Sequence, residues 1–139
     1  MKDRLLCRGI SVHSGEFVTG CYLVIDGRHF IQKNSVSDKV IPETVGQCTG
    51  RKDKNGKLTF EGDQFTASVL MNERGKSSAH GTYWIDVICV VVWVGCGFAG
   101  RWKIKDHKFC GKIFEGSGLR ELPTTEYLEI IGNIHEAKK

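Results

Sequence analysis

Proline is scarce in this sequence, and neither sign of charge is gathered into a block. The 139 residues include 2 prolines, 20 lysines and arginines and 16 aspartates and glutamates, which gives a formal net charge of +4. The two signs are interspersed along the chain. Because sequence-independent binding to nucleic acid phosphates usually requires a basic stripe or cluster, this composition favours a solvated surface of mixed charge.

Long apolar runs are also missing. The longest run, residues 85–94, is interrupted by Asp86 and falls short of the ~20 residues that cross a bilayer. The first residues, Met1-Lys2-Asp3-Arg4-Leu5-Leu6, lack the apolar core of a secretion signal. These absences predict a cytoplasmic protein without a membrane segment.

Paired metal-ligand motifs are absent as well. The 6 cysteines form no Cys-x-x-Cys motif, and only His107 and Cys110 have ligand-like spacing. One such pair cannot complete a tetrahedral zinc site, and cytoplasmic thiols are expected to be reduced. The glycines at 95, 97 and 100 match a dinucleotide loop by letter, but the residues after them alternate like a strand instead of opening a helix. We therefore predict no cofactor.

What the sequence does contain is typical of a mainly β protein. Its 17 glycines and its short runs of β-branched and aromatic residues suit many strands joined by tight turns. Asn55-Gly56 and Asp26-Gly27 each predict a two-residue type I′ hairpin turn. Residues 57–60 then form a strand, and Glu61-Gly62-Asp63 turns the chain into the next one.

Five further segments complete the prediction. Residues 33–42 look like a linker, and residues 83–94 predict a central strand that is buried on both faces or bent. Residues 98–105 predict a strand, residues 116–118 a turn, and residues 127–136 a closing strand.

One stretch mixes aromatic and basic side chains in a way that suggests a binding surface. The candidate residues are Arg101, Trp102, Lys103 and Lys105. Exposed aromatic rings beside cations can stack bases and follow a phosphate backbone. The simpler alternative places Trp93 and Trp102 in the core, with the basic residues on the solvated reverse side of the strand.

Separated blocks give the chain a family resemblance. The residues that carry it are Gln47, Thr49, Gly50, Asp53, Asn55, Gly56, Lys57, Glu61, Gly62, Asp63, Ile131, Gly132, Asn133, Ile134 and Glu136. In this order they resemble the YopX family of bacteriophage and prophage proteins, and Arg8-Gly9 matches the family's start more loosely. Arg51 stands where the family usually has an apolar residue.

The resemblance implies an N-terminal β-hairpin region, residues 1–42, followed by an SH3-like small β-barrel, residues 43–139. It also implies a protein encoded by a phage or prophage in a bacterial cell, in a family without an assigned activity. We expect a non-enzymatic binding module whose partner is nucleic acid or a host or phage protein.

Two alternatives stay open. A small metal- or carboxylate-dependent hydrolase using Asp53, Asp63 and His135 would require these side chains to converge, although an Asp in a turn more often accepts backbone amides. A self-assembling structural component, such as a homo-oligomer, is suggested by the apolar strand at residues 85–94.

Overall fold

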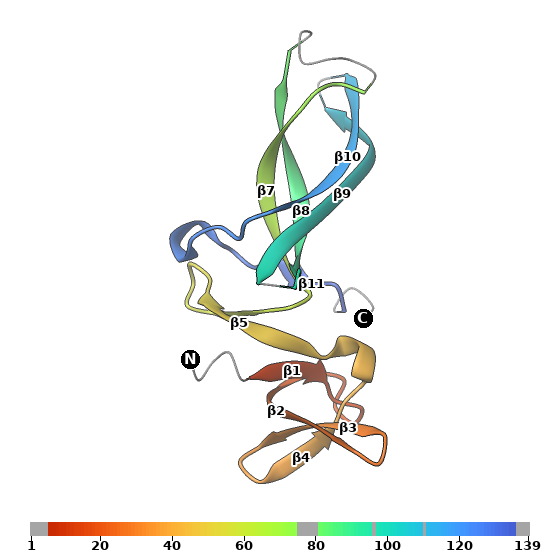
Figure 1. Cartoon of the computed structure of the whole chain (residues 1–139), viewed down its shortest axis with the longest axis vertical. Coiled ribbons are helices and arrows are strands. Elements are labelled where there is room, and N and C mark those ends of the chain that lie inside the picture. Colours follow the sequence, from red (N-terminus) through yellow and green to blue (C-terminus); the bar gives the residue numbers. More distant parts are fainter. Residues whose placement is uncertain (1–5, 75–80, 96, 110, 136–139) are drawn as a thin grey trace.

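Two antiparallel β-sheets follow one another along the long axis of the molecule (Figure 1). The computed structural model describes residues 6–74, 81–95, 97–109 and 111–135. The N-terminal sheet has the strand order β4-β3-β2-β1-β5-β6, and the C-terminal sheet has the order β10-β9-β8-β7-β11. The prediction of a mainly β protein is confirmed. In the described part of the chain, no helix is both long and apolar enough to cross a membrane.

The N-terminal sheet is built from six strands and includes part of the chain beyond residue 42. Its strands are β1 (Cys7–Ile10), β2 (Phe17–Ile25), β3 (Arg28–Lys33), β4 (Val36–Lys39), β5 (Gly46–Lys52) and β6 (Leu58–Phe60), with a 3-10 turn, η2 (Pro42–Thr44), before β5. β5 pairs with β1 through Cys7 opposite Gln47 and Arg8 opposite Gly46. The predicted boundary between residues 42 and 43 therefore falls inside this sheet, and the two sheets divide between β6 and β7.

The C-terminal sheet contains the longer strands. They are β7 (Asp63–Met71), β8 (Tyr83–Trp93), β9 (Phe98–Phe109), β10 (Lys112–Arg120) and the short β11 (Gly132–Asn133), with a 3-10 turn, η4 (Thr125–Tyr127), before β11. The predicted closing strand at 127–136 is thus reduced to a two-residue pairing with β7. The predicted turn at 116–118 is wrong, because β10 runs through Gly116 and Gly118, which lie against the Trp102 ring.

Neither sheet closes into a barrel within the described residues, so the SH3-like barrel is not confirmed. The β8–β9 ladder extends only from Trp93 opposite Phe98 to Val90 opposite Arg101. Beyond that point the two strands separate (Figure 1). β10 nevertheless returns to the region of β7, where the Arg120 Nη1 group donates to the Ser68 carbonyl at 2.8 Å.

The main core fills the concave side of the C-terminal sheet. It consists of Phe65, Ile85, Val87, Cys89, Val91, Phe114 and Leu128. β8 alternates between buried and exposed positions, so the prediction that it is buried on both faces is wrong. The outer face of β8 carries exposed side chains, and Trp84 is 65% exposed there.

The turns of the N-terminal sheet only partly follow the prediction. Asp26 and Gly27 have φ of 51° and 75°, as a type I′ turn requires, and this hairpin is confirmed. The predicted linker at 33–42 is wrong, because Asn34 and Ser35 also take positive φ, 51° and 67°, and turn the chain into β4. Neither residue is a glycine, so the usual glycine signal for such a turn is missing.

The turn at Asn55-Gly56 is also not of type I′. Gly56 has a φ of 82°, but Asn55 is not among the described residues with positive φ. Instead, the Gly56 amide donates to the Asp53 carbonyl at 3.0 Å and the Asp53 amide to the Lys57 carbonyl at 2.8 Å. This pattern fits a type I turn followed by a left-handed glycine, which is the three-residue form of the β-hairpin.

Candidate binding surface

Asp63 and Asn133, which belong to separate blocks of the family resemblance, meet at the junction between the two sheets. Asp63, the first residue of β7, is 1% exposed and forms a buried ion pair with Arg8 of β1. The same carboxylate accepts the Asn133 Nδ2 group at 3.0 Å and the Phe60 amide at 2.8 Å. Asp63 therefore joins three distant parts of the chain.

Two aromatic rings enclose the Arg8 guanidinium. Its Cζ atom lies 4.3 Å from the centre of the Phe17 ring and 4.5 Å from that of Phe60. Rings at this distance attract a cation through their quadrupoles. Together with Asp63, they compensate part of the cost of burying a charge.

Asp53 forms a second junction, between the β5–β6 turn and the segment before β11. Its Oδ1 atom accepts the amides of Asn55 at 2.9 Å and Lys57 at 3.0 Å, and its Oδ2 atom accepts the Ile130 amide at 3.2 Å. Burial would raise the pKa of Asp53, but the hydrogen bonds from Lys57, Ile130 and Asn55 outweigh burial and lower it below the ordinary value. Asp53 is thus held as a carboxylate by backbone donors.

The remaining motif residues shape the backbone around these carboxylates. Gly50 and Gly62 have φ of 84° and 92°, which glycine adopts with least strain. Gly50 and Thr49 lie within β5, at an irregularity in its register with β6, and not in a turn. The Glu61 Oε1 atom accepts the Gln47 amide at 3.3 Å, and Gly132 pairs with Gln64.

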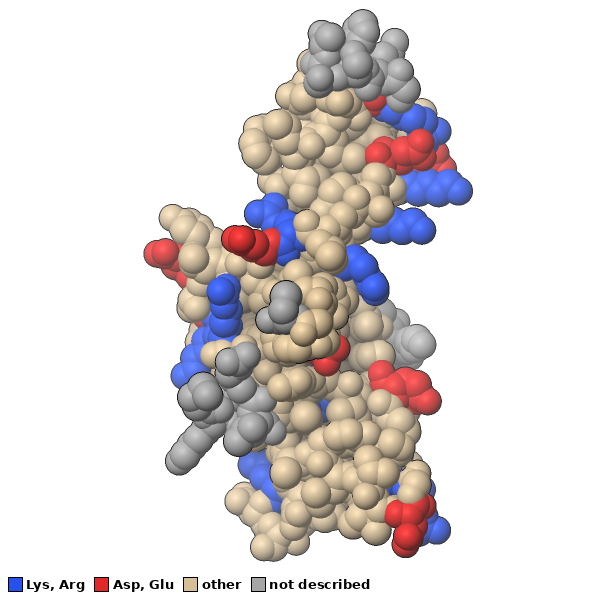
Figure 2. Space-filling model, viewed as in Figure 1, with Lys and Arg blue, Asp and Glu red and all other residues tan. Residues whose placement is uncertain are grey.

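The predicted binding residues do not share one face. Arg101, Lys103 and Lys105 are exposed on β9, whereas Trp102 is half-buried on the opposite side and packs against the core. Strand alternation therefore separates the Trp102 side chain from the side chains of its basic neighbours. In Figure 2, basic side chains project along the side of the C-terminal sheet where Figure 1 places β9.

Among the described residues, these three cations lack carboxylate partners. The ion pairs of the C-terminal sheet instead use Arg74, with Asp106 and Glu115, and Lys112, with Glu73. Within the described part of the chain, no hydrogen bond or ion pair engages the side chains of Arg101, Lys103 or Lys105. Their charge is therefore available to a partner.

A hollow of about 940 Å³ lies beside them, where β8 and β9 separate. Its lining combines aliphatic residues of β8 with the cations of β9 and the outer face of β10. The lining residues are Gln64, Ile88, Val90, Val92, Trp93, Val94, Arg101, Trp102, Lys103, Ser117, Gly118 and Leu119. This surface is apolar with a cationic rim.

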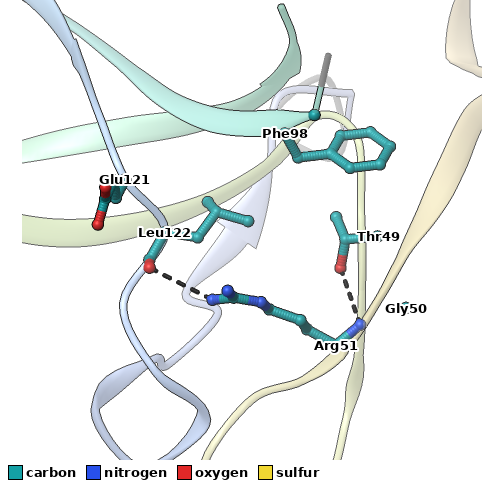
Figure 3. A pocket seen from close by; sticks show the side chains of 7 residues that line it. Thr49, Gly50, Arg51, Phe98, Glu121 and Leu122 are labelled. Carbon is teal, nitrogen blue, oxygen red and sulfur yellow. Dashed lines mark hydrogen bonds between the residues drawn. The ribbon is translucent and has the colours of Figure 1, made fainter.

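A second hollow, of about 590 Å³, lies between β5 and the segment after β10 (Figure 3). Arg51 extends across it toward Leu122, and its Nη1 group donates to the carbonyls of Leu122 at 3.3 Å and Pro123 at 2.9 Å. Arg51 thus ties β5 to this segment. Because its guanidinium is already bonded, the hollow offers a ligand less free charge than the first one.

The family assignment follows from a match over most of the chain. The model of the YopX family, described as YopX protein, matches residues 19–139. The chain belongs to the YopX family. No curated protein and no solved structure matches it significantly. The match contains the junction residues Asp53, Asp63 and Asn133, so these YopX motif positions have a structural role in this chain.

The YopX motif carboxylates are poorly placed for hydrolysis. All four oxygen atoms of Asp53 and Asp63 already accept hydrogen bonds from the chain itself. His135 approaches the junction through its backbone amide, which donates to Asn133 Oδ1 at 2.9 Å. Among the described residues, no group of three or more His, Cys, Asp or Glu side chains is arranged to hold a metal ion.

Sequence reasoning missed two features of this YopX protein. Arg8 was noted only as part of the family's start, and its pairing with Asp63 across 55 positions leaves no local signal. The second feature is the outer face of β8, where Trp84 and Ile88 are more than half exposed. Alternation within residues 83–93 could have placed them on the outer face.

Proposed function

We propose that this YopX protein is a non-enzymatic binding module, encoded by a phage or prophage and acting in the bacterial cytoplasm. The observation that supports a binding role is the row of exposed cations on β9, which have no carboxylate partner in the described part of the chain, beside an apolar hollow. Unpaired charge next to apolar surface is typical of recognition sites. The partner is a nucleic acid or a host or phage protein.

The SH3-like barrel remains part of the proposal for the C-terminal sheet. Its support is the return of β10 toward β7, where the Arg74 amide donates to the Ile113 carbonyl at 2.7 Å. Small barrels of this kind commonly bind ligands on their outer strands.

Salt-dependent binding tests the proposal. The purified chain is mixed with single- and double-stranded DNA and RNA at two salt concentrations, and binding is followed by fluorescence anisotropy. A nucleic acid partner predicts binding that weakens steeply with salt and is lost in Lys103→Glu/Lys105→Glu. The matched control is Arg28→Glu/Lys39→Glu, which reverses two exposed charges on the N-terminal sheet and should bind normally.

Absence of nucleic acid binding leaves a protein partner, which affinity capture from lysogenic cells would then identify. Capture that depends on Lys103 and Lys105 supports the module. If neither nucleic acid nor a protein binds in a way that depends on β9, the proposed function is wrong.

Self-association is a second candidate function, favoured by the outer face of the β7–β8 pair. Leu70 lies opposite Trp84, and both are more than half exposed, at 54% and 65%. Exposed apolar residues that are neighbours on a sheet often form subunit contacts. Light scattering should then show an oligomer that Trp84→Lys converts to a monomer, and a monomeric wild-type chain would remove this candidate.

A further inference from the structure

β8 has a free edge along part of its length. Its ladder with β9 ends at Val90 opposite Arg101, yet β8 continues back to Tyr83 and β9 continues on to Phe109. β7 pairs with β8 along the other side, from Gln64 opposite Val90 to Met71 opposite Tyr83. Between Tyr83 and Cys89, therefore, β8 has a neighbouring strand on one side within the described chain.

A free strand edge presents backbone N–H and C=O groups that have no partner strand. In an antiparallel sheet, alternate residues direct their backbone N–H and C=O groups to opposite sides. The groups of β8 that point away from β7 face the fork between β8 and β9. Such an edge can accept another extended chain.

The side chains around the fork indicate which chain would fit. Ile88 and Val90 provide aliphatic surface on β8, and Leu119 adds to it from β10. Lys103 lies on the β9 wall, and Arg101 lies where the fork closes, paired with Val90. Neither cation has a carboxylate partner among the described residues. A ligand that complements both walls carries aliphatic and acidic side chains.

We propose that the fork between β8 and β9 binds an extended, acidic peptide segment of a partner protein, which adds to the free edge of β8. Its aliphatic side chains contact Ile88 and Val90, and its carboxylates contact Arg101 and Lys103. This inference rests on the proposed binding function and specifies the partner within it.

A nucleic acid suits the fork less well. Stacked bases require open aromatic faces, whereas the aliphatic residues above dominate the β8 wall. Trp93 contacts Phe98 edge to face, with ring centres 5.1 Å apart. The Trp102 ring lies against Gly116 and Gly118. Both tryptophans therefore already have intramolecular neighbours.

The test begins with selection from a library of random peptides of about ten residues, long enough to form one strand. The full chain is the bait, and the affinity of each enriched peptide is measured by anisotropy. We expect enriched sequences in which acidic and aliphatic residues alternate. Lys103→Glu should weaken their binding about tenfold or more, because it replaces attraction with repulsion.

Two further variants locate the site. Ile88→Glu places a negative charge in the fork at an exposed position and should also weaken binding about tenfold. Lys108→Glu makes the same charge change as Lys103→Glu on the same strand, outside the residues that line the hollow. It should leave the affinity unchanged.

Amide hydrogen exchange provides a separate readout of strand addition. Bound peptide should slow the exchange of alternate β8 amides between residues 83 and 89. Enriched peptides without acidic residues, no enrichment, or binding that Lys103→Glu and Ile88→Glu do not alter would overturn the inference. If the chain then binds DNA, RNA or a captured protein through β9, the proposed function survives with a different partner, and if it binds none of these, both proposals fail.

Discussion

Arg8 of β1 and Asp63 of β7 form a buried ion pair that connects the two sheets. The rings of Phe17 and Phe60 cover the Arg8 guanidinium, and the Asn133 side chain donates a hydrogen bond to Asp63. Because each charge lacks access to water, each depends on the other for compensation. This pair is therefore one of the contacts that join the two sheets, and the Asp53 junction is another.

Replacing Asp63 with Ala should cost about 3–5 kcal/mol, because it leaves the Arg8 charge buried and unpaired. Urea unfolding monitored by circular dichroism measures the loss. Lys54→Ala is the control, since its ion pair with Glu129 is about half exposed and should contribute less than about 1 kcal/mol. Equal effects of the two substitutions would contradict the role assigned to the buried pair.

The β5–β6 turn predicts unequal effects at neighbouring positions. Gly56→Val should destabilise by more than about 1 kcal/mol, because a β-branched residue resists positive φ. Asn55→Ala should change stability by less than about 0.5 kcal/mol, since Asn55 needs no left-handed conformation and is exposed. Thermal melts of both variants decide the turn type, and a large loss in Asn55→Ala would restore the type I′ turn.

Trp93 should tolerate truncation better than a core residue does. It is 49% exposed, so Trp93→Ala should cost about 1 kcal/mol, well below the ~3 kcal/mol or more expected of a buried tryptophan. Phe65→Ala, at a position only 1% exposed, should cost about 3–5 kcal/mol. Chemical unfolding of the two variants would reveal a core role for Trp93 if their losses were similar.

Acid should destabilise the protein partly through Asp53. Its pKa is lower in the folded state than its ordinary value of 3.8, so the folded state favours the carboxylate. The stabilisation is complete above the unfolded-state pKa and is lost as pH falls through the folded-state pKa. Unfolding free energies measured from pH 6 downward should therefore converge for wild type and Asp53→Asn, and a constant difference in acid would contradict the assignment.

Local features of the fold were predictable, and features set by distant contacts were not. Asp26-Gly27 identified its hairpin because both residues tolerate positive φ, whereas β4 was missed because Asn34 and Ser35 are not glycines. The exposure of Trp84 follows the alternation within β8, but the point where β9 diverges from β8 depends on contacts between distant residues and has no local signal. Of the candidate binding residues, Arg101, Lys103 and Lys105 are exposed and Trp102 is packed against the core, and their role in binding stays a prediction.

The segment that follows η4 contacts the core and both buried aspartates, although only two of its residues form a strand. Leu128 fills the core, the Ile130 amide binds Asp53 and the Asn133 side chain binds Asp63. These residues are synthesised after Asp53 and Asp63. The hydrogen bonds from Ile130 and Asn133 to the two carboxylates therefore form only late in synthesis. A nascent chain interrupted before Ile130 would expose two incompletely bonded aspartates and an unfilled core, which would mark it for proteolysis.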